Sequence, residues 1–435
     1  MVCCHHYQFI ADGDDVFTVD VSRIRFGPGA LRELGSEVRL LDIKRAAVFT
    51  DKEVMQLECF TDAIDTLHDS GIVIEVFDEV EVEPTNRSFK EASRFAVEGS
   101  FDGLISIGGG SVIDTCKAAN LYSSYPADFL AYVNAPFGEG QIIPGPLKPH
   151  IACPTTSGTG SECTGIAVFD LLETRTKTGI MSRYLMPDRA IVDPRWTTSL
   201  PPVVVAATGF DAISHALEAF TARPYTVRAQ PERPELRPMT QGANPWSDMV
   251  CKEALRRCGK YLVRAVHDPV DVDARHGMMY AATLSGMAFG NGGCHLPHAM
   301  SYSVSGRIKE YQPVGYPPDK PICPHGISVI VNAPASYRFT ASASPERHLE
   351  GARLLGADVG DGGSGEGGEI LAEHLTSMMK QTDMPNGIGG VGFDSSDIDV
   401  LVSGALAQQR LLSVSPRDVQ DEDLQSLYTA ALHYW

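Results

Sequence analysis

The residues best suited to chemistry are an aspartate and several histidines in the second half of the chain. Asp211 and His215 stand four residues apart, so on a helix the carboxylate and the imidazole share one face, one turn apart. His295 and His298 follow a pair of glycines, and His325 lies between two turn-forming residues. One carboxylate with two or three imidazoles is an ordinary ligand set for Fe²⁺ or Zn²⁺. The spacing is compatible with a metal site and also with structural histidines.

The other nine histidines have no such partners nearby in the sequence. We expect them to lie at the surface or at helix ends. They are His5, His6, His68, His150, His267, His276, His348, His374 and His433.

A glycine-rich turn in the first half could hold a phosphate. Gly108, Gly109 and Gly110 follow a short apolar run, and Ser111 opens a helical pattern that contains Asp114. Glycines let the backbone approach a ligand, and the free N–H groups at a helix N-terminus point at an anion. The pattern is not the G-x-G-x-x-G fingerprint, so a tight turn without a ligand is the alternative.

Two further polar segments follow strand-like runs. Asp51 ends one run, where a carboxylate can hydrogen-bond a ribose 2′-hydroxyl and repel a 2′-phosphate, or can simply cap the helix that follows. The loop 154–162 is rich in hydroxyl groups and glycines and follows another run. Ligands of open α/β sheets bind at the carboxyl ends of the strands, so this position favours a ligand loop over a plain flexible turn.

The elements that must position these residues differ between the two halves of the chain. Before Pro194, β-branched runs alternate with helix-like stretches, which indicates βαβ units and a mainly parallel sheet. After it the apolar periodicity is mostly helical. We therefore predict an α/β dinucleotide-binding domain over 1–196 and a helical metal-binding and substrate domain over 197–435.

Composition limits the possible functions. The chain has 435 residues with 36 Lys and Arg against 55 Asp and Glu, a net charge of −19. Such a charge repels nucleic acid and anionic membranes, so we expect neither as a partner. The ten cysteines form no C-x-x-C pair and indicate reduced thiols. No apolar run is long enough to span a membrane, so we expect a cytoplasmic protein, or a matrix protein if this is a processed mitochondrial form.

Taken together, the motifs of this chain resemble the iron-containing alcohol dehydrogenase family. They occur in the family's order from near residue 20 to past residue 330. The matching stretches are Phe26-Gly27-x-Gly29, Thr50-Asp51, Gly108-Gly109-Gly110-Ser111-x-x-Asp114, Pro154-Thr155-Thr156-x-Gly158-Thr159-Gly160-Ser161-Glu162, Asp211-x-x-x-His215-Ala216-x-Glu218 and Pro324-His325-Gly326.

The resemblance implies a Rossmann-like nucleotide domain followed by a helical metal domain, the architecture shared with dehydroquinate synthase. It implies Fe²⁺ (or Zn²⁺) held by Asp211, His215, His298 and His325, with His295 as the substitute for His298. It also implies NAD as the cofactor. The residues that match the family's cofactor contacts are Asp51, Gly109, Gly110, Ser111, Asp114, Thr155, Thr156, Thr159 and Lys177.

One position departs from the family pattern. Many members carry His-Gly-x-x-His, whereas this chain has Tyr302 in the place of the second histidine. His295 or Tyr302 could relay the substrate proton, and both are candidate catalytic residues. We also expect a homodimer or a larger homo-oligomer.

Within the family, the chain most resembles the members that exchange hydride between a hydroxyacid and an oxoacid. The resemblance implies 4-hydroxybutyrate and 2-oxoglutarate as substrates and succinic semialdehyde and 2-hydroxyglutarate as products. Both substrates carry a remote carboxylate, so a basic anchor is expected. The candidates are Arg223, Arg228, Arg233, Arg237, Arg307 and Lys309.

Three other functions compete with this interpretation. The first is an NAD-dependent alcohol dehydrogenase or aldehyde reductase that releases its cofactor. The second is a lyase like dehydroquinate synthase, which is disfavoured by the low content of basic residues. The third is a non-catalytic binding protein, against which the complete metal quartet argues.

Overall fold

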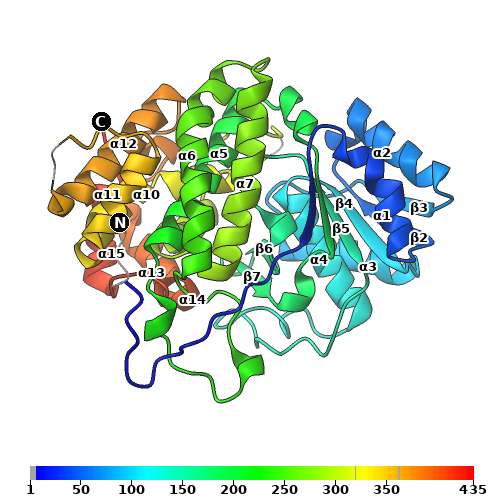
Figure 1. The fold of residues 1–435 in the computed structure, drawn as a ribbon, viewed down its shortest axis with the longest axis horizontal. Helices are drawn as coiled ribbons and strands as arrows, with labels where there is room; N and C mark the ends of the chain where they lie inside the picture. Colours follow the sequence, from blue (N-terminus) through cyan, green and yellow to red (C-terminus); the bar gives the residue numbers. More distant parts are fainter. Residues whose placement is uncertain (1–5, 319, 361–362) are drawn as a thin grey trace. The chain divides into compact units, whose positions relative to one another are not determined.

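The computed structural model describes residues 6–318, 320–360 and 363–435. Contacts within the chain divide it into two compact units. The first is formed by the described part of Met1–Asp20 together with Pro201–Trp435, and the second is Val21–Leu200. The predicted fold class, an α/β domain and a helical domain, is confirmed by this architecture (Figure 1).

The second unit is built on a six-stranded sheet in the order β1-β8-β5-β4-β2-β3, in which every neighbouring pair runs parallel. Parallel neighbours require crossover connections, and β1 to β5 alternate with helices along the chain. The strands are β1 (Arg23–Phe26), β2 (Arg45–Phe49), β3 (Val73–Phe77), β4 (Gly103–Gly108), β5 (His150–Pro154) and β8 (Arg189–Val192).

Helices cover both faces of this sheet because successive side chains of a strand point to opposite sides. From β2, Ala46 and Val48 pack against α1 (Leu34–Leu40) and α2 (Glu58–Asp69). Ala47 and Phe49 pack on the other side. The helices on that side are α3 (Asn86–Glu98) and α4 (Gly110–Ser124). A separate antiparallel hairpin is formed by β6 (Ile166–Leu171) and β7 (Thr176–Met181).

The first unit is a bundle of helices built around α5 (Pro202–Thr221), which packs against α6, α7 and α9. Among the described helices, α5 alone is long and apolar enough to cross a membrane by length and composition, but 89% of its most apolar window is buried in the protein. It is the core helix of this unit. The other helices are α6 (Pro245–His267), α7 (Val272–Gly292), α8 (Leu296–Ser305), α9 (His325–Ile330), α10 (Ala333–Thr340), α11 (Pro345–Leu354), α12 (Gly367–Gln381), α13 (Ile398–Leu406), α14 (Gln409–Leu412) and α15 (Asp421–Ala430).

The N-terminal arm, residues 6–20, belongs to the helical unit, whereas the sequence placed it with the nucleotide domain. Asp14 is fully buried and pairs with Arg228 and with Arg237, the latter at 2.8 Å. A buried carboxylate needs such partners, and these stand more than 200 residues away in the sequence. Local sequence patterns therefore could not place the arm.

Two buried histidines contradict the prediction that they lie at the surface or at helix ends. His150 lies in β5, inside the sheet, and its Nε2 is 2.8 Å from the hydroxyl of Ser106. His348 is fully buried, with its Nε2 2.9 Å from the hydroxyl of Thr340. His5 lies outside the described residues.

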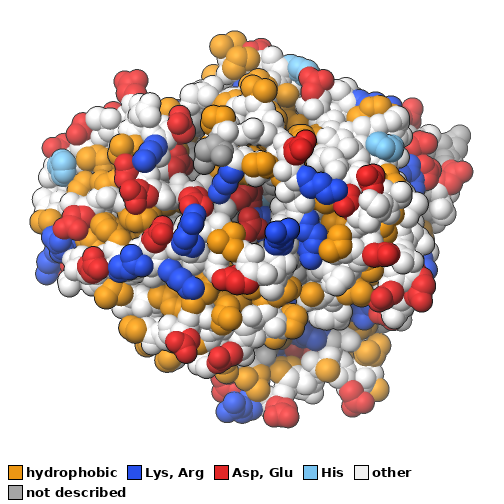
Figure 2. Space-filling view, turned by 180° about the vertical axis from the view of Figure 1, so that it is seen from behind, with side chains coloured by type: hydrophobic (Ala, Val, Ile, Leu, Met, Phe, Trp, Pro, Cys, Tyr) orange, Lys and Arg blue, Asp and Glu red, His pale blue; other side chains and the backbone are white. Residues whose placement is uncertain are grey.

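The eight cysteines in the described part of the chain are free thiols, and all but Cys59 are buried. Cys3 and Cys4 lie outside the described residues. On the face drawn in Figure 2, acidic, basic and hydrophobic side chains are interspersed.

Candidate functional site

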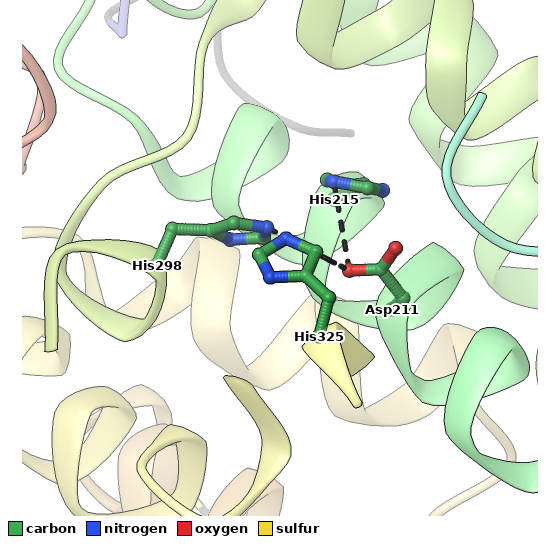
Figure 3. Close-up of side chains that lie close together, drawn as sticks. All are labelled: Asp211, His215, His298 and His325. Carbon is green, nitrogen blue, oxygen red and sulfur yellow. Dashed lines mark ion pairs between the residues drawn. The ribbon is translucent and has the colours of Figure 1, made fainter. Parts of the chain in front are cut away.

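Four of the predicted residues converge inside the helical unit. Asp211 and His215 lie one turn apart on α5, His298 lies on α8, and His325 is the first residue of α9. One ligand atom from each lies within 4.8 Å of the others. Figure 3 shows the four side chains, with dashed lines for the ion pairs of Asp211. Three helices from distant parts of the sequence thus bring one carboxylate and three imidazoles together.

The distances in this quartet suit a divalent ion better than hydrogen bonds. Asp211 Oδ1 lies 3.7 Å from Nε2 of His215, 3.7 Å from Nε2 of His298 and 3.8 Å from Nε2 of His325. Around a tetrahedral ion with bonds of about 2.1 Å, neighbouring ligand atoms lie about 3.4 Å apart. Asp211 Oδ1 and His298 Nε2 are buried and make no hydrogen bond to any residue that the structure describes. Buried polar atoms that face one another without bonding are what a metal site requires.

Burial and charge put two of the four ligands, His215 and Asp211, in the protonation states that a metal requires. Burial lowers the pKa of His215 to about 4, so its ring is neutral at neutral pH and offers a lone pair. For Asp211 burial alone would raise the pKa, but in acid, where the rings of His215 and His325 are protonated, their charges more than offset it and hold the pKa below its usual range. The His215 ring also stacks on Phe289 with 4.0 Å between centroids, which fixes its plane.

A glycine permits the close contact that brings His325 to α5. A Cβ at Gly326 would lie 1.9 Å from the carbonyl oxygen of Ala207 and 3.0 Å from Cβ of Asp211. No side chain fits there, so only glycine lets α9 begin against α5. The imidazole of His325 then faces Asp211.

The structure includes His298, not His295, in the quartet. His295 is fully buried, its Nε2 lies 3.0 Å from the hydroxyl of Thr221, and burial lowers its pKa to about 4. Tyr302 lies one turn after His298 on α8, buried, with its ring centre 6.1 Å from that of His325. The proton-relay role of either residue stays a prediction.

In the sheet unit, the two predicted nucleotide loops are in contact. β4 ends at Gly108 and α4 begins at Gly110. A Cβ at Gly110 would lie 2.5 Å from Cγ2 of Thr159, and a Cβ at Gly109 would lie 3.3 Å from Cγ2 of Thr156. Thr155 donates its N–H to the Gly108 carbonyl at 3.0 Å. The glycines therefore let the threonine loop close over the start of α4.

The charged residues predicted around these loops contact other parts of the protein. Asp51 accepts hydrogen bonds from the N–H groups of Glu53 and Val54, at 3.0 and 2.8 Å, so the helix-capping alternative is realised. This does not exclude a contact with ribose.

Three more of the predicted cofactor residues, Ser111, Asp114 and Lys177, contact the β6–β7 hairpin or the loop before α3. Asp114 accepts the N–H of Val168 at 2.9 Å. Lys177 pairs with Asp170 at 3.0 Å and with Glu83, whose N–H donates to Ser111. Their nucleotide contacts stay predictions.

Most of the arginines predicted to anchor a carboxylate are already paired within the protein. Arg228 and Arg237 both hold Asp14, and Arg223 pairs with Asp418 at 2.5 Å. Lys309 pairs with Asp397 at 2.8 Å, and Arg307 donates to the Ser303 hydroxyl at 3.1 Å. The arginine-rich excursion fastens the N-terminal arm, so its predicted role as a substrate anchor is not supported by these contacts. Arg233 is exposed.

Comparison with known proteins decides the family. Residues 21–194 match the iron-containing alcohol dehydrogenase family, and residues 239–432 match the C-terminal domain of the Fe-containing alcohol dehydrogenase family. The chain belongs to the iron-containing alcohol dehydrogenase family. It is therefore an oxidoreductase by descent.

Curated relatives share most of the length of this family member. It is 46% identical over 421 residues to a mitochondrial hydroxyacid-oxoacid transhydrogenase of Bos taurus, covering 96% of this chain and 90% of the relative. It is 42% identical over 430 residues to a probable mitochondrial hydroxyacid-oxoacid transhydrogenase of Dictyostelium discoideum, covering 95% and 79%.

Solved structures of the family have the same fold. A 1,3-propanediol oxidoreductase superposes with a TM-score of 0.83 at 26% identity, covering 96% of this chain and 100% of the other. An alcohol dehydrogenase from Oenococcus oeni gives the same TM-score, identity and coverage.

Two buried residues of this dehydrogenase received no role from the sequence. Lys117 is buried in the sheet unit, and its Nζ lies 2.7 Å from both the Ser161 hydroxyl and the Ile166 carbonyl. Glu218 lies on α5 and contacts His298. Glu218 stands seven residues after Asp211 and three after His215, a helical spacing that could have placed it on the same face.

Proposed function

We propose that this chain transfers hydride between a hydroxyacid and an oxoacid through a bound NAD. The proposed reaction converts 4-hydroxybutyrate and 2-oxoglutarate to succinic semialdehyde and 2-hydroxyglutarate. The observation that carries it is the convergence of Asp211, His215, His298 and His325, in a chain 46% identical over 96% of its length to a hydroxyacid-oxoacid transhydrogenase.

In this proposal the quartet holds Fe²⁺ or Zn²⁺. Such an ion lowers the pKa of a coordinated alcohol and polarises a carbonyl in the reverse direction. Asp211 supplies the negative charge and the three imidazoles supply neutral donors, so one positive charge of the ion remains to act on substrate. The stacking of His215 on Phe289 keeps one ligand ring in place with an apolar surface.

The nucleotide loops hold the cofactor in this proposal. The N–H groups at the start of α4 and the threonine loop bind the pyrophosphate, where Gly109 and Gly110 let the backbone approach. Asp51 accepts a ribose hydroxyl and repels a 2′-phosphate. The remaining proposed contacts are Ser111, Asp114, Thr155, Thr156, Thr159 and Lys177.

The two half-reactions balance without free NAD. In the first, the alcohol carbon of 4-hydroxybutyrate gives hydride to NAD⁺ and its hydroxyl loses a proton, leaving succinic semialdehyde and NADH. In the second, the keto carbon of 2-oxoglutarate would take up the same hydride and its oxygen a proton, so that bound NAD would end in its starting state. We assign the proton transfer to Tyr302, which lies one turn from His298, with His295 as the alternative.

The test is turnover by purified protein with both acids and no added NAD. We expect succinic semialdehyde and 2-hydroxyglutarate in equal amounts, and retained NAD in a mass spectrum of the protein. Strict dependence on added NAD would instead indicate an NAD-dependent alcohol dehydrogenase or aldehyde reductase. The ion pairs of Arg228 and Arg237 with Asp14 favour this alternative, because they remove two predicted anchors for a remote carboxylate.

A second comparison separates the two functions through the substrate. If the site binds the carboxylate, 4-hydroxybutyrate should exceed 1-butanol by well over about tenfold in kcat/KM, because an unpaired buried cation is costly. Equal values for the two would contradict the transhydrogenase proposal. Succinic semialdehyde and butanal serve as the matched pair in the reverse direction.

The proposal also includes a location, which follows the names of the relatives, and an oligomeric state. The curated relatives are named mitochondrial, and we propose the mitochondrial matrix rather than the cytoplasm for this chain. We also propose a homodimer or larger homo-oligomer. Light scattering on the purified protein would test the assembly, and imaging of the tagged full-length protein would test the location.

A further inference from the structure

Glu218 is a buried acid that the proposed reaction does not use. It is completely buried on α5, on the helix face that carries Asp211 and His215. Burying a carboxylate is costly unless its oxygens accept hydrogen bonds. The hydrogen bonds that Glu218 accepts therefore indicate which groups this carboxylate positions.

Both oxygens of Glu218 bind the beginning of α8. Oε1 accepts a hydrogen bond from Nδ1 of His298 at 2.5 Å, and Oε2 accepts the backbone N–H of His295 at 2.6 Å. His295 is the residue before the first turn of α8, and its own side chain does not cap the helix. A carboxylate from α5 thus does the capping, and the positive end of the α8 dipole favours its charge.

We propose that Glu218 is a positioning residue that presents Nε2 of His298 to the metal ion. A neutral imidazole carries one ring proton, so a neutral His298 whose Nδ1 donates to a carboxylate has its lone pair on Nε2. That Nε2 lies 3.7 Å from Asp211 Oδ1, inside the quartet. The inference rests on the proposed metal site and adds the residue that orients one ligand.

The chemistry of the contacts requires a carboxylate at this position. Two donors, an imidazole N–H and a backbone N–H, face the two oxygens of Glu218. A glutamine offers one oxygen and one NH₂ group, so one of the two donors would face another donor. An aspartate keeps both oxygens but sets them one methylene further from α8.

Cys294 offers a competing interpretation. Glu218, Cys294 and His298 also lie close enough to hold an ion. That ion would have to take Nδ1 of His298, which already donates to Glu218. Binding of one equivalent of metal supports the positioning role, and binding of two equivalents would overturn it.

The test is metal binding by metal-free protein, measured without turnover. Co²⁺ is titrated into wild type, Glu218→Gln, Glu218→Asp and Thr221→Val, and its visible absorption reports the ligand geometry. Losing a partner that orients a ligand typically weakens metal affinity about 10- to 100-fold, and we expect this for Glu218→Gln with an altered spectrum. Thr221→Val removes the hydroxyl beside His295 from the same helix and should bind Co²⁺ as wild type does.

The Glu218→Asp variant keeps the test decisive if Glu218→Gln does not fold. Circular dichroism of each metal-free variant identifies a protein that has lost its fold. A role as a buried charge alone predicts wild-type affinity for Glu218→Asp, and that result would overturn the proposal. Weakened binding with a changed spectrum supports it. If wild type itself binds no Co²⁺ or Zn²⁺, the metal assignment fails, and this inference fails with it.

Discussion

The quartet that we propose to hold metal and the loops that we propose to hold the nucleotide belong to one chain, but they are built differently. In the quartet, side chains supply the candidate binding atoms, and Asp211 Oδ1 and His298 Nε2 have no hydrogen-bond partner within 6–318, 320–360 and 363–435. In the loops, the charged side chains Asp114 and Lys177 contact protein groups, while glycines bring two backbone segments together. A candidate site for a small cation is recognised by the types of its side chains. A candidate site for an extended anion is recognised by the course of its backbone.

The largest loss of activity should follow the removal of one side chain of the quartet. We expect His325→Ala to lower kcat/KM by about 1000-fold or more, since partners that merely orient a ligand are worth about 10- to 100-fold. Metal content and kcat/KM should fall together, while NADH binding, measured by fluorescence, stays within about twofold. Full activity without bound metal would contradict the assignment of the quartet.

A side chain added at a glycine of the nucleotide loops should weaken NADH binding. The Cβ of Gly110→Ala would lie 2.5 Å from Cγ2 of Thr159, so the threonine loop must move. Overpacking of this kind costs about 1 to 3 kcal/mol, which is about tenfold or more in NADH affinity if the loops bind the cofactor.

Gly109→Ala is the matched control, because its Cβ meets Thr156 at 3.3 Å and a small shift relieves the contact. We expect a loss of only a few fold in NADH affinity for this variant. Equal losses for the two variants would mean that the contact between the loops is not what matters. Metal content should be unchanged in both.

A smaller effect is expected from Asp51, the acidic side chain predicted to distinguish NAD from NADP. Asp51→Gly should reduce the preference for NAD over NADP several-fold, because the carboxylate repels a 2′-phosphate. The variant also loses the cap on the N–H groups of Glu53 and Val54, so a thermal scan must accompany the kinetics. A wild type that prefers NADP would refute this role for Asp51.

The smallest effect on either site should come from the N-terminal arm. Asp14→Asn removes a buried partner of Arg228 and Arg237, and we expect the free energy of unfolding to fall by about 2 to 4 kcal/mol. NADH affinity should not change, since the arm belongs to the helical unit. Thermal unfolding and NADH titration of the same sample would check both statements.

The loss of stability in Asp14→Asn should depend on pH. Burial alone would raise the pKa of Asp14, but hydrogen bonds from Arg237 and Arg228 lower it to about 2. The folded state thus holds this carboxylate charged more strongly than the unfolded state, where the pKa is near 3.8. Its contribution to stability is complete above pH 4 and is lost as the pH falls toward 2. Wild type and Asp14→Asn should therefore converge in stability in acid, and a constant difference down to pH 2 would contradict this.

Much of the fold and the quartet could be predicted from the sequence because the signals are local. Strand and helix alternation is visible in successive residues, and the spacing of Asp211 and His215 places both on one helix face. The choice between His295 and His298 was harder. They flank the first residues of α8, and their rings contact residues of α5 that stand roughly eighty residues earlier in the sequence, Thr221 for His295 and Glu218 for His298.

The differences between expectation and structure come from contacts that no local pattern shows, most of them between distant segments. The arginines after α5 read as free cations, since nothing near them indicates that Asp14 would pair with them. His150 and His348 read as surface residues because their hydrogen-bonding partners, Ser106 and Thr340, become neighbours only after folding or helix packing. Charge and polarity alone do not reveal such pairs.

The long separation between the arm and its partners has a consequence for the newly made chain. Asp14 leaves the ribosome 223 residues before Arg237, its partner in the helical unit. At about 5 to 20 residues per second, this delay lasts roughly 10 to 45 seconds. During that time the whole of Val21–Leu200 is synthesised and can fold, while the arm ahead of it has not met its partners. The arm is therefore made before Val21–Leu200 but can be fastened only after that unit has been made.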